Sequence, residues 1–301
     1  MMKSIKILFV LVIVLFSCGK DERNFYIENS IKDDIGNTIV IEKPPRKIIT
    51  LAPNLTEMIF DLKLEKYLIG NTLYCNYPEE ARKIHKVGDM LSYDFEKILT
   101  LKPDLIFITV EGNTKEAYDK FKELRLKIFV SNPRNIYGIK KTYLDIAKIF
   151  GVESFAKNRI STWDSITNHI INSSKKYKRK KAMFIIELKP IMLAGKNTFI
   201  NEYLEVCALS NIASDSKLNY PVFSREEILK QNPDYIIVPS NGYFTPKRIL
   251  EIYPEWKNLS AFKNNNVITV NADLFVRPGP RYTEALKELF ILLHPQEKFL
   301  H

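Results

Sequence analysis

The stretch DFEKILTLKPDLIFI at residues 94–108 decides the fold of this chain, because the chain uses it twice. The second copy, SREEILKQNPDYIIV at residues 224–238, follows at a constant offset with no gap. In each copy a capping residue, Asp94 or Ser224, precedes a short helical stretch, a Pro-Asp turn and an apolar run typical of a buried parallel strand. Two copies separated by a domain's length predict two similar lobes.

Each copy also carries a glutamate at the expected second helical position, Glu96 in the first and Glu226 in the second. The helix dipole favours an acidic side chain there, so helix stabilisation alone is one interpretation. In the second copy Glu227 completes a Ser224-x-x-Glu227 capping box, which leaves Glu226 free to point outward. Surface contact with a partner is therefore the other interpretation of Glu96 and Glu226.

Composition excludes several classes of protein. A chain of 301 residues with 46% hydrophobic residues can hold two domains with their own cores. The net charge is +10, but the basic residues are dispersed, and the one dense run, 175–181, has no aromatic platform beyond Tyr177. We therefore expect no nucleic-acid partner. The histidines are scattered and no Cys-x-x-Cys is present, so we expect no metal site.

The N-terminus has the features of an export signal. Lys3 and Lys6 precede an apolar run that is too short to span a bilayer comfortably and ends in Leu-Phe-Ser-Cys-Gly. We interpret residues 1–17 as a lipoprotein signal peptide, Cys18 as the lipidated residue and residues 18–32 as a tether. This predicts an exported protein anchored to the outer face of a bacterial membrane. A plain signal peptide with an incidental cysteine is the alternative.

Strand and helix patterns alternate through the rest of the chain, which predicts an α/β fold with parallel sheets. We expect an N-terminal lobe at residues 33–135, linking helices at 136–178 and a C-terminal lobe at 179–301. The run from Glu153 to Tyr177 lacks Gly and Pro and has one apolar face, and as a helix it would be about 37 Å long. Such a helix is long enough to bridge the lobes.

Three local patterns give further expectations. Residues 33–42, with Gly36-Asn37 at the turn, predict a hairpin. Residues 54–57, Asn-Leu-Thr-Glu, have the pattern of a capping signature, which predicts a helix that starts there. Residues 273–280 read as a loop before a closing helix at 281–293. Cys75 and Cys207 fall in different lobes, so we do not expect them to pair.

Five passages together carry a resemblance to a known family. They are the two copies of the repeated stretch, IITLAPNLTE at 48–57, YCNYP at 74–78 and RPGPR at 277–281. With them the chain resembles the cobalamin/iron-type periplasmic binding proteins, the helical-backbone receptors of ABC importers. The resemblance extends from residue 46 to about residue 295. The order of the motifs is most similar to that of the cobalamin receptors.

The resemblance implies two α/β lobes joined by one long helix, with the ligand in the cleft between them. It implies that a glutamate on each lobe, here Glu96 and Glu226, docks into arginine pockets of the permease. The cleft positions that match are Tyr74, Met90, Tyr220 and Asp273, with Arg277 in the same loop as Asp273. The chain departs from the cobalamin receptors at Met90, where they often have an aromatic residue, and at Thr109-Val110.

These positions suit a large planar ligand. Tyr74, Met90 and Tyr220 offer flat apolar contacts, and Asn54, Asp273 and Arg277 offer polar groups that could fix orientation. Together with the resemblance, this predicts a transported metal chelate, cobalamin or a related corrinoid, delivered by a monomeric lipoprotein to an ABC permease dimer with its ATPase.

Two other kinds of function are weighed against this prediction. The same fold could bind haem, with Tyr74 or Tyr220 on the iron, or an iron–siderophore, which would want more cationic groups than Arg277. An enzyme is not expected, since the sequence has no nucleophile elbow, no Gly-rich phosphate loop and no His–carboxylate pair, and hence no catalytic residues. A structural lipoprotein would leave the paired glutamates unexplained.

Overall fold

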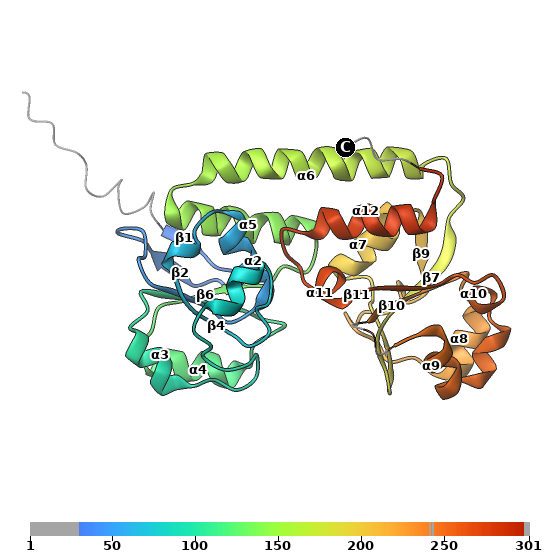
Figure 1. Ribbon diagram of the computed structural model, residues 1–301, viewed down its shortest axis with the longest axis horizontal. Helices are drawn as coiled ribbons and strands as arrows, with labels where there is room; N and C mark the ends of the chain where they lie inside the picture. The colour runs from blue at the N-terminus through green and yellow to red at the C-terminus, as the bar shows by residue number, and fades with distance from the viewer. Residues whose placement is uncertain (1–29, 241, 243, 298–301) are drawn as a thin grey trace, which may run out of the picture.

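The computed structural model describes residues 30–240, 242 and 244–297, and it shows two α/β lobes side by side under one long helix (Figure 1). The expected signal peptide, Cys18 and most of the expected tether lie outside the described residues. The last three residues assigned to the tether instead form strand β1 (Ser30–Lys32), which pairs antiparallel with β2 (Thr38–Val40). The predicted hairpin is therefore confirmed, and it begins three residues earlier than expected.

The N-terminal lobe is built on a parallel sheet of four strands in the order β4-β3-β5-β6. The strands are β3 (Ile48–Thr50), β4 (Leu68–Asn71), β5 (Leu105–Thr109) and β6 (Ile128–Ser131). The helices of this lobe include α2 (Pro53–Asp61), α3 (Phe95–Leu101) and α4 (Lys115–Glu123). All five residues of β5 are buried, as expected of a strand covered on both faces.

The two copies of the repeated stretch have the same structure. Helix α3 and helix α8 (Arg225–Gln231) are capped by the side chains of Asp94 and Ser224, and both end in a left-handed residue. The aspartate of each Pro-Asp pair then accepts a hydrogen bond from a backbone N–H at or just before the start of a neighbouring strand. Asp104 accepts from Lys47 at 2.9 Å, and Asp234 accepts from Lys181 at 2.9 Å. The Pro-Asp turn thus aligns the starts of two parallel strands in each lobe.

The C-terminal lobe has a mixed sheet in the order β11-β10-β7-β8, with β9 also paired to β7. The strands are β7 (Lys180–Leu188), β8 (Ile191–Leu193), β9 (Leu209–Asn211), β10 (Tyr235–Ser240) and β11 (Val267–Asn271). Strand β8 is antiparallel to β7, whereas the other pairings are parallel. The expected parallel sheet is confirmed in its main strands, and β8 adds one antiparallel pairing, because a two-residue connection can only return a strand antiparallel.

Three helices form the layer on one side of the two lobes: α5 (Ile136–Phe150), α6 (Glu153–Ser174) and α12 (Tyr282–Leu293). Helix α6 runs across both lobes, with α5 beneath one half and α12 beneath the other (Figure 1). The buried Trp163 ring of α6 lies 4.7 Å from the Tyr143 ring of α5 and 5.5 Å from the Tyr282 ring of α12. One hydrophobic core therefore continues from lobe to lobe through α6, which confirms the predicted bridge.

No helix in the described ranges is long and apolar enough to cross a bilayer. The remaining helices of the C-terminal lobe are short: α7 (Phe199–Val206), α9 (Pro246–Ile252), α10 (Ser260–Lys263) and α11 (Ala272–Phe275). Of these, α7 contacts α6.

Two local expectations are corrected. Helix α2 starts at Pro53, a residue that needs no N–H partner in the first turn, and its cap position, Ala52, has no side-chain bond. Asn54 and Glu57 are therefore residues of the helix itself, with buried side chains, and neither of them caps it. The first three residues of the expected loop at 273–280 belong to the short helix α11 (Ala272–Phe275), which is capped by the side chain of Asn271.

Candidate ligand-binding site

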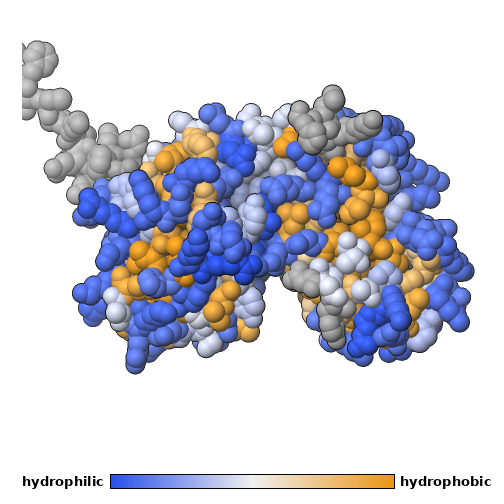
Figure 2. All heavy atoms as spheres, in the orientation of Figure 1, coloured by the Kyte–Doolittle hydropathy of each residue, from blue (hydrophilic) through white to orange (hydrophobic). Residues whose placement is uncertain are grey.

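A cleft of about 530 Å³ lies between the two lobes. The space-filling view shows the lobes separated by a notch on the side away from α6 (Figure 2). The N-terminal lobe and the segment after β6 contribute Pro53, Asn54, Tyr74, Met90, Thr109, Glu111, Gly112 and Pro133 to its wall. The C-terminal lobe contributes Ile186, Phe199, Ile200, Tyr220, Pro239, Ala272, Val276, Arg277 and Pro278. Most of these side chains are apolar, which suits a large flat ligand.

The structure brings five of the six predicted ligand residues to this cleft: Asn54, Tyr74, Met90, Tyr220 and Arg277. Tyr74 and Tyr220 come from opposite lobes, and Tyr74 is 57% exposed. Asp273 does not line the cleft, and its carboxylate is bound by Asn76 and Arg277.

Two glycines allow the loop conformations that place Met90 and Tyr220 in the cleft wall. Gly88 has a φ of +125°, and a Cβ there would lie 2.3 Å from the carbonyl oxygen of Ser92, so only glycine fits the tight turn that presents Met90. At Gly195 a Cβ would lie 2.5 Å from the carbonyl oxygen of Leu218. The segment that carries Tyr220 can therefore cross close to the end of β8.

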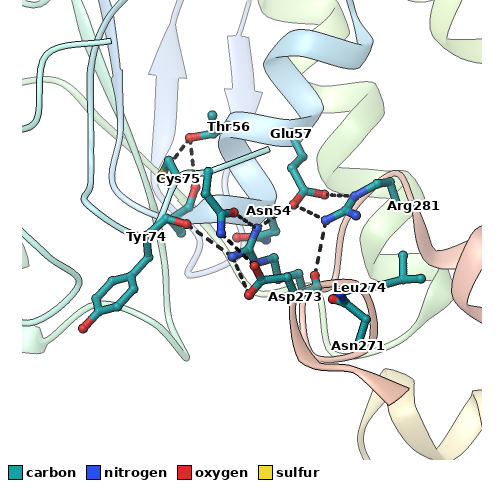
Figure 3. Close-up of polar contacts among 12 residues, drawn as sticks. Asn54, Thr56, Glu57, Tyr74, Cys75, Asn271, Asp273, Leu274 and Arg281 are labelled. Carbon is teal, nitrogen blue, oxygen red and sulfur yellow. Dashed lines mark hydrogen bonds and ion pairs between the residues drawn. The ribbon is translucent and has the colours of Figure 1, made fainter. Parts of the chain in front are cut away.

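A polar network joins the lobes at one end of the cleft (Figure 3). Glu57 on α2 accepts from Arg277 Nη1 at 3.0 Å and from Arg281 Nε and Nη2 at 2.9 and 2.7 Å. Its side chain is 2% exposed. Arg281 also lies over the ring of Tyr77, 3.7 Å from its centroid. Burial alone would lower the pKa of Arg281, but hydrogen bonding and charge attraction from Glu57 raise it overall.

Both terminal nitrogens of Arg277 are engaged by the protein. Its Nη1 also donates to the side-chain oxygen of Asn76 at 2.8 Å, and its Nη2 donates to the Tyr74 carbonyl at 3.3 Å and pairs with Asp273 at 2.8 Å. Asp273 in turn accepts from Asn76 Nδ2 at 2.7 Å. Arg277 and Asp273, which the sequence analysis assigned to orienting a ligand, are used here to hold the lobes together.

Glu111, which sequence reasoning missed, reaches across the cleft. Its carboxylate accepts from the Tyr220 hydroxyl at 3.1 Å and from Asn219 Nδ2 at 3.3 Å, both in the other lobe. Burial, reinforced by Glu111, raises the pKa of the Tyr220 phenol well above its ordinary value. No local pattern around Glu111 signals this role, because its partners lie more than a hundred residues further along the chain.

The two repeat-copy glutamates, Glu96 and Glu226, are exposed at the starts of α3 and α8. Both helices lie on the side of the molecule away from α6, one on each lobe (Figure 1). Within the described ranges neither carboxylate takes part in an ion pair or a side-chain hydrogen bond, whereas the neighbouring Arg225 is drawn toward Glu255 and Tyr253.

The described residues contain no group of three or more His, Cys, Asp or Glu that could hold a metal ion. Cys75 and Cys207 are buried and unpaired with each other, as expected from their separate lobes. Burial raises the pKa of the Cys207 thiol, so this residue is an inert part of the core.

The fold and the cleft define a class: two α/β lobes under one bridging helix, with a ligand cleft between them, are the architecture of a substrate-binding protein of an ABC transporter. The chain belongs to the periplasmic binding protein family, whose model matches residues 48–274. This is a family of solute-binding transport proteins.

Two relatives are similar to this chain in sequence, and one solved structure shares its fold. It is 31% identical over 275 residues to the uncharacterised ABC transporter substrate-binding lipoprotein YvrC of Bacillus subtilis, covering 88% of this chain and 85% of that protein. It is 30% identical to the vitamin B12-binding protein of Salmonella typhimurium, covering 81% and 88%. A periplasmic haem-binding protein of Pseudomonas aeruginosa has a TM-score of 0.77 at 18% identity, covering 85% and 95%, which shows a common fold alone.

Proposed function

We propose that this protein is a membrane-anchored receptor that captures cobalamin or a related corrinoid between its lobes and delivers it to an ABC permease. The observation that carries the proposal is the apolar cleft with Tyr74 and Tyr220 on opposite lobes and Met90 between them in sequence. Aromatic and thioether side chains on both walls suit a flat macrocycle. The vitamin B12-binding name of the Salmonella relative supports the same ligand.

Haem or an iron–siderophore is the alternative ligand on the same fold. A haem receptor could place the phenolate of Tyr74 or Tyr220 on the iron, but the Tyr220 hydroxyl is already engaged by Glu111 at 3.1 Å, which leaves Tyr74 for that role. A polyanionic siderophore would need free cations, and the guanidinium of Arg277 is already engaged by the protein. Both observations favour the corrinoid.

The ligand class can be tested by absorption spectroscopy. Purified protein is mixed with cyanocobalamin or with haemin, desalted and scanned. We expect the corrinoid spectrum to stay with the protein. Retention of haemin together with complete loss of cyanocobalamin would replace the corrinoid with haem as the ligand.

The tyrosine pair gives a prediction on affinity. Tyr74→Ala and Tyr220→Ala should each weaken cyanocobalamin binding by about ten- to hundredfold, since loss of an aromatic contact costs about 1–3 kcal/mol. Calorimetry measures the change. Tyr137→Ala is the matched control, because Tyr137 is 74% exposed on α5 and does not line the cleft. Unchanged affinity in both cleft variants would remove the proposed sandwich.

The proposed lipid anchor on Cys18 gives a second prediction. Cys18→Ala should move the protein from the detergent phase to the aqueous phase in a partition assay and abolish incorporation of labelled fatty acid, because a thioether-linked lipid needs the thiol. Ser17→Ala is the control, since it keeps a small residue before the cysteine. Equal membrane partitioning of the Cys18 variant would contradict lipidation.

We further propose that the receptor acts as a monomer on a permease dimer with its ATPase, and that Glu96 and Glu226 are the docking residues. Their exposure, their equal positions on two copies of one motif and their common side of the molecule support this role. The approximate symmetry of the lobes would match the symmetry of a dimeric permease.

A further inference from the structure

The charges in the cleft wall are unequally available to a ligand. Among the described residues that line it, only Glu111 and Arg277 carry a formal charge. Arg277 has a 10% exposed side chain, and each of its two terminal nitrogens already faces two protein oxygens. A ligand in this cleft therefore meets the carboxylate of Glu111 and no free cation from the described wall.

Glu111 is held as a hydrogen-bond acceptor at the cleft. Its side chain is 29% exposed and takes a phenolic and an amide hydrogen from the opposite lobe, at 3.1 and 3.3 Å. A carboxylate has about four acceptor sites, so two remain for further donors. The longer bond, from Asn219, is also the easier one for a ligand N–H to replace.

One cation lies near Glu111 but not in the cleft. Arg134 Nε is 3.5 Å from the Glu111 carboxylate, and its side chain is 42% exposed. The same Nε donates to Asn132 Oδ1 at 3.1 Å, and Arg134 does not line the cleft. An exposed pair of this kind contributes little, so Arg134 offsets the charge of Glu111 only in part.

We propose that Glu111 is a specificity-determining residue, which accepts hydrogen bonds from neutral N–H donors on the rim of the ligand and rejects ligands that carry carboxylates there. This rests on the proposed function, that the ligand is a large metal chelate of the corrinoid type. The substrate class is thereby narrowed to chelates with carboxamide side chains, since a like charge against Glu111 in a partly desolvated cleft is repelled.

The test uses matched ligands. Mild acid hydrolysis turns single propionamides of cyanocobalamin into propionates, which gives monocarboxylic acids of nearly the same size and shape. Affinities of cyanocobalamin and of each acid are measured by calorimetry for the wild type, Glu111→Gln and Arg134→Gln. Glu116→Gln, an exposed glutamate of α4 outside the cleft, controls for the loss of one negative charge.

The wild type should prefer the amide over at least one of the acids by about tenfold or more, and Glu111→Gln should remove most of that preference. Arg134→Gln should increase the preference, because it leaves Glu111 without its cation, and Glu116→Gln should not alter it. The preference of the wild type should also shrink as salt is added, since screening acts on charge and not on shape.

The outcomes separate the two proposals. If the wild type binds cyanocobalamin but Glu111→Gln keeps the wild-type preference for the amide, the specificity role of Glu111 is overturned and the corrinoid function stands. If the wild type binds neither the amide nor any of the acids, the corrinoid function fails and the role of Glu111 fails with it.

Discussion

Replacement of Glu57 by glutamine is expected to lower the free energy of unfolding by about 3–5 kcal/mol, the cost of breaking a buried ion pair by removing one partner. Glu57 is 2% exposed and pairs with Arg277 and Arg281, whose side chains are 10% and 14% exposed. Without the carboxylate, Arg281 loses its ion-pair partner in the described network, and Arg277 keeps only Asp273. Urea unfolding at neutral pH measures the loss.

The same change should also weaken ligand binding, because the network ties α2 to the segment that carries Arg277 and so fixes one lobe against the other. Glu284→Gln is the matched control: Glu284 lies on α12 beside Arg281 but is exposed and takes part in none of the ion pairs of the described residues. Arg281→Gln should cost less in the Glu57→Gln background than in the wild type. Equal stability of Glu57→Gln and Glu284→Gln would show that the network does not stabilise the interlobe arrangement.

Lysine at both Glu96 and Glu226 is expected to abolish receptor-dependent uptake while leaving folding and ligand affinity intact. A charge-assisted pair with arginine fixes register as well as attracting, and loss of a desolvated pair costs about 2–5 kcal/mol. Lysine adds repulsion to that loss, so Glu96→Lys/Glu226→Lys should be worse than the corresponding double alanine variant. Uptake of labelled ligand and receptor–permease binding measure the effect.

The control for this experiment is Glu65→Lys/Glu153→Lys. Glu65 and Glu153 are the first residues of the 3-10 helix Glu65–Tyr67 and of α6, so the change in net charge is the same and each lysine again replaces an acidic residue in a first helical turn. This variant should transport normally. Wild-type uptake by the Glu96→Lys/Glu226→Lys protein would contradict the docking role.

The sequence alone determined the architecture, because its signals are local. The repeated stretch predicted two equivalent cap–helix–turn–strand units, and α3–β5 and α8–β10 confirm them. The run from 153 to 177 predicted the bridging helix, because a long stretch without Gly or Pro and with one apolar face has few other structures. Strand β8 was missed because it is only three residues long and, unlike the predicted hairpin at 33–42, has no Gly-Asn turn before it.

Tertiary structure alone decided the chemistry of the cleft. Glu57 read as part of a capping signature, yet it pairs with Arg277 and Arg281, more than two hundred residues away. Glu111 had no distinguishing neighbours, yet it faces Tyr220 and Asn219 across the cleft. Arg277 was interpreted as a ligand-binding group, but both of its terminal nitrogens are bound within the protein. Caps, turns and periodicity depend on residues a few positions apart, whereas the partner of a buried charge is fixed only when the two lobes meet.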